Sequence, residues 1–103
     1  MEDIGMVLEN IVCLELLRCG YEVTVGMIDN EEIDFIGVKN NEPVYIQVSY
    51  LMPDKKTQAR EFGNLLKIED NYPKYVVTMD EVDMSQSGIR HMHIRDFLLL
   101  REY

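Results

Sequence analysis

The chain has 103 residues, a formal net charge of −9 and a sequence pI near 4.5. That length allows one small domain with a single core, and the 47% hydrophobic and 28% charged content is that of an ordinary soluble globular protein. Only ten residues are basic, so we expect the isolated chain not to bind nucleic acid. The sequence contains no glycine-rich phosphate-binding motif, which argues against a nucleotide site of the P-loop or Rossmann type.

The first predicted element is a helix over residues 3–19, apolar nearly all round, with Gly20 just past its end. On a helical wheel the solvent-facing arc holds three polar residues: Asn10, Glu15 and Arg18. Cys13 and Cys19 point in different directions on this helix and cannot easily pair, so we interpret both as buried reduced thiols. With no signal peptide and no long apolar segment, the sequence predicts a cytoplasmic protein that does not enter a membrane.

Glu9 lies opposite the solvent arc, on the core side of this helix. A carboxylate in such a place is costly unless it is paired, protonated or bound to a cation. Two interpretations follow. Either backbone amides or a core tyrosine satisfy Glu9, or Glu9 belongs to a functional site and faces Asp34.

Three strands are predicted next, over residues 21–25 and in the two halves of the segment 31–50. A turn at residues 26–30 joins the first two strands, and a Lys39-Asn40-Asn41 turn joins the second and third. Strand alternation places Asp34 on the face of Ile36 and Val38. An acid in the middle of a strand is unfavourable, so Asp34 requires a reason. On the third strand, Gln47 and Ser49 project side by side.

The second half reads as helix, strand, long loop, strand and short helix. Asp54 is expected to cap a helix over residues 55–68, which has a core-facing apolar stripe and charged residues that we place in solvent: Arg60, Glu61 and Lys67. A buried strand follows at 75–79, parallel to the sheet because a crossover helix precedes it. A loop at 80–88, a strand at 89–94 and a helix at 95–100 complete the chain. The fold class is therefore α/β, with a central mixed sheet of four or five strands and flanking helices.

His91 and His93 share one face of the last predicted strand. Such a pair can bind a metal, but no cysteine or carboxylate stands at ligand spacing beside it. We therefore place both histidines on a solvent face.

The order of elements, with Glu9 in the first helix, Asp34 in the second strand and Gln47 in the third, resembles the restriction-endonuclease-like PD-(D/E)XK core. The chain looks more closely like the carboxy-terminal domain of a prokaryotic family of AAA-superfamily ATPases. The segments that carry this resemblance are, in order, Asp3-Ile4-Gly5, Leu8-Glu9-Asn10, Gly20-Tyr21-Glu22-Val23, Glu32-Ile33-Asp34-Phe35, Tyr45-Ile46-Gln47-Val48-Ser49-Tyr50, Arg60-Glu61-Phe62, Asp70-Asn71-Tyr72-Pro73-Lys74-Tyr75, Gly88-Ile89 and Asp96-Phe97-Leu98.

The resemblance implies that residues 1–103 form a single nuclease-like domain, either excised from a larger ATPase or made as a naturally short protein. The partner it implies is an ATPase domain in cis, where ATP would be hydrolysed. A homo-oligomer formed through an exposed sheet edge is a further alternative for partners.

In nucleases of this fold, carboxylates hold Mg²⁺ and a lysine stabilises the charge that develops on the phosphate. Carried onto this chain, Glu9 and Asp34 become the metal ligands, Gln47 offers a neutral amide oxygen, and Ser49 stands at the lysine position. Lys39 is on the wrong strand face to replace it, whereas Lys56 remains a candidate. We therefore expect a non-catalytic accessory or regulatory domain without a cofactor. The alternative is a Mg²⁺-dependent nuclease with a rearranged active site.

Overall fold

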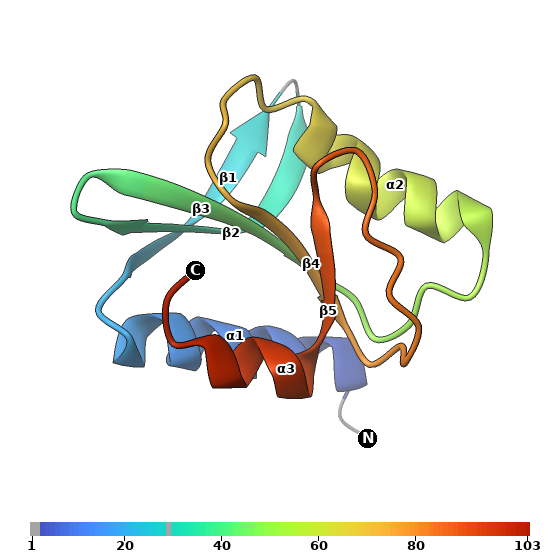
Figure 1. Cartoon of the computed structure of the whole chain (residues 1–103), viewed down its shortest axis with the longest axis horizontal. Coiled ribbons are helices and arrows are strands. Elements are labelled where there is room, and N and C mark those ends of the chain that lie inside the picture. The colour runs from blue at the N-terminus through green and yellow to red at the C-terminus, as the bar shows by residue number, and fades with distance from the viewer. Residues whose placement is uncertain (1–2, 29) are drawn as a thin grey trace.

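The computed structural model describes residues 3–28 and 30–103. Five strands form one mixed sheet in the order β1-β2-β3-β4-β5, and three helices pack on it (Figure 1). The elements are α1 (Ile4–Arg18), β1 (Glu22–Ile28), β2 (Glu31–Lys39), β3 (Glu42–Val48), α2 (Lys55–Leu66), β4 (Lys74–Thr78), β5 (Arg90–His93) and α3 (Ile94–Leu100). β1, β2 and β3 are antiparallel neighbours, whereas β3, β4 and β5 run parallel. The predicted α/β fold with a mixed sheet of four or five strands is confirmed.

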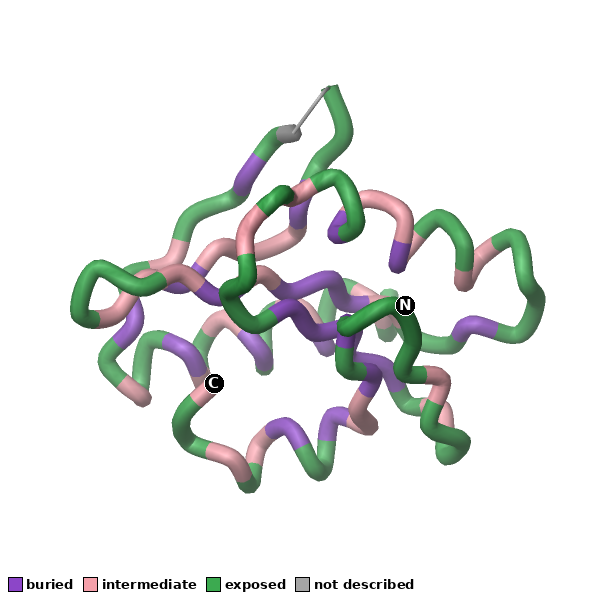
Figure 2. Tube along the Cα trace, turned by 45° about the horizontal axis from the view of Figure 1, so that its top comes forward, coloured by how far each residue is buried: buried purple, intermediate pink, exposed green. Residues whose placement is uncertain are grey.

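Helices cover both faces of the sheet. α1 and α3 lie side by side on one face and α2 lies on the other (Figure 1). The core is accordingly divided in two, and buried residues of each helix turn toward the sheet (Figure 2). The α1–α3 side is built on Leu8, Val12, Leu16, Val77 and Phe97. The α2 side is built on Ile33, Met52, Phe62, Leu65 and Val76.

Side-chain caps fix where the first two helices begin. Asp3 accepts a hydrogen bond from the Gly5 amide at 2.8 Å, and Asp54 accepts one from the Thr57 amide at 2.8 Å. Each bond satisfies an amide that has no partner inside its helix. Gly20 follows α1 with φ of 92°, a left-handed conformation that favours glycine. The predicted caps at Asp54 and Gly20 are confirmed.

The hairpin between β2 and β3 closes through a two-residue turn. Lys39 pairs with Glu42, and Asn40 and Asn41 between them have φ of 55° and 65°. Two successive left-handed residues suit the twist of a hairpin, and asparagine tolerates them better than most side chains. This confirms the turn predicted at Lys39-Asn40-Asn41.

β1 is longer than predicted, since it runs to Ile28 instead of ending at residue 25. Gly26 therefore lies inside the strand and not in a turn. Its backbone approaches β2 so closely that a Cβ atom at Gly26 would collide with the side chain of Ile36. Close approach, not chain reversal, is the reason for glycine at this position. Residue 29, which we placed in that turn, lies outside the described residues.

The other boundaries differ by one or two residues, and α3 follows β5 directly at Ile94. Cys13 and Cys19 are free thiols, as predicted, but they are half-buried rather than buried. Within residues 3–28 and 30–103, no helix is long and apolar enough to cross a membrane.

Candidate functional site

The candidate site lies where β2 and β3 stop pairing through their backbones. The ladder between them extends from Lys39–Glu42 as far as Phe35–Ile46. The next residues on the two strands are Asp34 and Gln47, two of the predicted site residues. β3 continues from there beside β4, with Gln47 opposite Val76. The structure thus brings Asp34 and Gln47 together at a fork in the sheet.

Side chains replace the backbone ladder at this fork. The Gln47 Oε1 atom accepts a hydrogen bond from the Asp34 amide at 2.7 Å, and Gln47 Nε2 donates to the Glu32 carbonyl at 3.4 Å. In return, the Asp34 Oδ2 atom accepts a hydrogen bond from the Val48 amide at 2.8 Å. We call this reciprocal arrangement the Asp34–Gln47 bridge. Gln47 is only 3% exposed, so without these bonds its amide would be buried and unsatisfied.

A β-bulge sets the position of Asp34. The pairs that flank the irregularity between β1 and β2 are Thr24–Ile36 and Gly26–Ile33. One residue of β1 therefore faces two residues of β2, Asp34 and Phe35, which is the pattern of a bulge. Ile33 and Ile36 consequently pack on the same side, with α2. The strict alternation that we used to place Asp34 on the face of Ile36 does not hold across this segment.

Three carboxylates lie near this fork: Glu9 of α1, Asp34 of β2 and Glu61 of α2. Burial raises the pKa of Glu9, and repulsion from Asp34 raises it further. Burial also raises the pKa of Asp34 against the opposing effect of its hydrogen bond from Val48. Burial, followed by repulsion from Asp34, raises the pKa of Glu61 to about 7. Because α1 and α2 lie on opposite faces of the sheet, the two glutamates approach Asp34 from opposite layers.

Glu61 is the member of this group that sequence reasoning missed. We placed it in solvent, but its side chain is only 13% exposed, with Arg60 at 3.7 Å as its ion-pair partner. The helical spacing of α2 did indicate that Glu61 is buried. Glu61 stands one turn before the buried Leu65, so both lie on one side of α2.

The predicted metal ligands Glu9 and Asp34 are not joined by a third metal-ligating side chain among the described residues. Among the described residues, no group of three or more His, Cys, Asp or Glu side chains is placed to hold a metal ion. The Gln47 amide oxygen is turned onto the backbone of β2. Ser49, at the lysine position, donates its hydroxyl to the Leu51 carbonyl at 3.2 Å. The Gln47 and Ser49 side chains are therefore bonded to the backbone, whereas a Mg²⁺ site needs several convergent oxygen atoms.

The two candidate lysines are placed elsewhere. Lys39 donates to the Cys19 carbonyl at 3.0 Å, at the far end of the β2–β3 hairpin from Asp34. Lys56 is exposed in the first turn of α2. Neither lysine hydrogen-bonds to the Asp34–Gln47 bridge.

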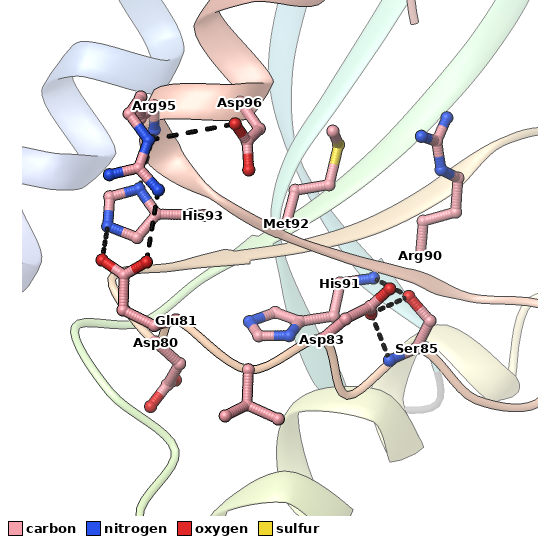
Figure 3. Close-up of a pocket in the computed structure, with 11 residues that line it drawn as sticks. Asp80, Glu81, Asp83, Ser85, Arg90, His91, Met92, His93, Arg95 and Asp96 are labelled. Atoms are coloured by element: carbon pink, nitrogen blue, oxygen red, sulfur yellow. Dashed lines mark hydrogen bonds and ion pairs between the residues drawn. The ribbon is translucent and has the colours of Figure 1, made fainter.

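A polar cavity of about 260 Å³ beside β5 contains the two histidines (Figure 3). Our placement of both on a solvent face is wrong, because His91 is only 5% exposed and the side chain of His93 only 11%. The His91 Nδ1 atom accepts from the Met84 amide at 2.9 Å, and its Nε2 atom lies 2.7 Å from Thr78 Oγ1. Burial lowers the pKa of His91, which favours the neutral ring that these bonds require.

His93, on the same strand, has a different structural role. Its Nδ1 atom accepts a hydrogen bond from the Arg95 amide at 3.0 Å and so caps α3. Its Nε2 atom lies 3.6 Å from the Glu81 carboxylate (Figure 3). The rings of His91 and His93 therefore hydrogen-bond to different parts of the structure.

Most of this chain is similar in sequence to part of a longer known protein. The chain is 44% identical over 93 residues to an uncharacterized protein of Haemophilus influenzae. The match covers 89% of this chain but 22% of that protein. The chain thus spans about a fifth of the length of its relative. No protein family and no solved structure matches it.

The first prediction concerns the Asp34–Gln47 bridge. Gln47→Ala leaves the Asp34 amide without its partner and leaves the Glu32 carbonyl only its hydrogen bond from Asn64 Nδ2, so we expect the free energy of unfolding to fall by about 2–4 kcal/mol. Urea denaturation measures this free energy of unfolding. Gln58→Ala is the matched control, because the Gln58 amide makes one long hydrogen bond of 3.4 Å to the Met52 carbonyl. Equal losses in the two variants would show that the bridge stabilises the fold no more than one long hydrogen bond does, which contradicts the prediction.

The second prediction concerns the pH dependence of stability. The folded chain holds the Glu61 proton up to a pH of about 7, whereas an ordinary glutamate loses it near 4.5. Stability from Glu61 is therefore fully present below pH 4.5 and is lost as the pH rises through about 7. Glu61→Gln cannot ionise, so it should be more stable than wild type at alkaline pH by roughly 1–3 kcal/mol, with little difference in acid.

Denaturant titrations at several pH values measure this difference. Glu69→Gln, on an exposed segment, is the control for removing one carboxylate away from the fork. A Glu61→Gln profile parallel to that of wild type would contradict the prediction.

Proposed function

We propose that this chain is a non-catalytic accessory domain with a restriction-endonuclease-like PD-(D/E)XK core. It serves a cytoplasmic AAA-superfamily ATPase in cis as a docking or regulatory module. The observation that carries the proposal is the Asp34–Gln47 bridge. Two of the three residues that would form a nuclease centre are committed to holding β2 against β3. The bridge thus supplies a structural reason for an acid in the middle of a strand.

The length of the relative supports the accessory role, because a protein in which this segment makes up 22% has room for other domains. In this proposal ATP is bound and hydrolysed by one of those other domains. The chain described here contributes a folded surface and no phosphate-binding loop.

Electrostatics favour a non-catalytic domain as well. A nuclease needs positive charge where the phosphate gains negative charge in the transition state. At the corresponding place this chain has the Ser49 hydroxyl, bonded to a backbone carbonyl. The net charge of −9 also repels a nucleic-acid substrate.

One observation favours a second candidate, a divalent-metal-dependent nuclease with a rearranged active site. Carboxylates that repel one another are stabilised by a bound cation, and three of them approach the fork from α1, β2 and α2. In that case Glu9, Asp34 and Glu61 would rearrange to bind Mg²⁺, and Gln47 would keep its structural role.

The third prediction separates the two candidates. The purified chain should not cut single-stranded, duplex or branched DNA, or RNA, with Mg²⁺ or Mn²⁺. The missing cationic group alone typically costs about 10²–10³ in rate. Ser49→Lys restores a positive charge and is tested beside wild type, with Ser87→Lys on the 80–88 loop as the control for added charge alone.

Asp34→Asn is the matched loss-of-charge variant, because an asparagine oxygen still accepts from Val48 whereas alanine would break the bridge. Metal-dependent cleavage by wild type that disappears in Asp34→Asn would refute the non-catalytic proposal and establish the nuclease.

A further inference from the structure

α1 buries only one of its apolar faces. Leu8, Val12 and Leu16 pack against the sheet. Six other large apolar side chains of the same helix are exposed: Ile4, Met6, Val7, Ile11, Leu14 and Leu17. Leu14 and Leu17, at 66% and 51%, are more than half accessible. Several large apolar side chains exposed along one helix of a small domain indicate an interaction site.

The central part of this surface has the spacing of a helix-pairing seam. Ile4, Val7, Ile11 and Leu14 follow one another at alternating steps of three and four residues. This is the heptad pattern, in which a narrow apolar stripe runs almost straight along one side of a helix. We call these four residues the α1 stripe. A stripe of this shape is complementary to another helix carrying the same pattern.

The charges at the ends of the α1 stripe indicate which helix packs on it. Arg18 stands one further step along the stripe; its side chain is 59% exposed and is bonded to Glu15 by an ion pair and two hydrogen bonds. Asp3 caps the opposite end of the helix. Between these ends the stripe carries no charge. Two such helices packed antiparallel would bring Arg18 of each copy to Asp3 of the other, and would also oppose their helix dipoles favourably.

A parallel arrangement lacks this complementarity, because it would place Arg18 beside Arg18 and Asp3 beside Asp3. The acidic surface elsewhere on the domain also disfavours unspecific contact between copies. The α1 stripe is thus an uncharged seam on an acidic protein.

We propose that a second copy of this chain covers the α1 stripe, with the two α1 helices antiparallel about a two-fold axis at Ile11. Ile11 packs on Ile11, Val7 of each copy packs on Leu14 of the other, and Arg18 pairs with Asp3. This surface lies on a helix, whereas the homo-oligomer considered from the sequence would form through an exposed sheet edge. The proposed dimer does not depend on the accessory role proposed above.

The fourth prediction is that the chain is a dimer through this seam. Light scattering after size exclusion should give twice the 12.1 kDa chain mass at high protein concentration, falling toward one chain on dilution. Ile11→Glu places two carboxylates at the axis and should give a monomer throughout. Val82→Glu, on the loop and 69% exposed, adds the same charge away from α1 and should leave the dimer intact. Circular dichroism confirms that each variant is folded.

Cross-linking tests the orientation. In a Cys13→Ser, Cys19→Ser background, Ile11→Cys should form a disulfide-linked dimer rapidly on mild oxidation. Ile4→Cys should not, because the two copies of that position lie about 21 Å apart along an antiparallel pair at about 1.5 Å per residue. A wild-type chain that stays monomeric at every concentration would overturn the proposal. So would a dimer that persists in Ile11→Glu, or cross-linking at Ile4 as fast as at Ile11.

Discussion

The sheet depends on the Asp34–Gln47 bridge. β3 must pair antiparallel with β2 on one side and parallel with β4 on the other. Beyond Phe35–Ile46, the backbone pairing between β2 and β3 ends, which leaves amides and carbonyls without ladder partners in a buried region. The two side chains satisfy those groups in both directions. They allow the strands to separate without leaving unpaired polar atoms, and the fork therefore forms at a fixed position.

The fork also explains why carboxylates gather there. Where two strands diverge, side chains from helices on both faces approach the same strand end, and here they are Glu9 and Glu61. Desolvation and mutual repulsion raise their pKa values, which destabilises the folded state at high pH. Asp34 keeps its place because its Oδ2 atom is an acceptor that Val48 requires. Asp34 is thus needed for backbone hydrogen bonding at the fork, although its charge raises the pKa values of Glu9 and Glu61.

Most of the fold could be predicted because its signals are local. The caps at Asp54 and Gly20, the asparagine turn and the parallel β4 all follow from short patterns. The candidate site was harder to predict from the sequence. The bulge at Asp34-Phe35 is a matter of register between strands, which no single-strand pattern contains. Glu61, His91 and His93 were misplaced because charged and histidine residues are mostly solvated, and only their tertiary partners bury them here. On α1 the polar residues predicted a solvent arc, but the large apolar side chains that share this arc were not recognised as an exposed surface.

The most direct test of this account is whether Asp34 serves the backbone or a metal ion. Two-dimensional ¹H–¹⁵N spectra of the labelled chain, titrated with paramagnetic Mn²⁺, report the distance of each amide from any bound ion. We expect the Asp34 and Val48 amides to stay sharp and to exchange slowly with solvent, with only weak broadening at exposed acids such as Glu69. Saturable broadening centred on Asp34, Val48 and the amides around Glu9 and Glu61 would contradict the account.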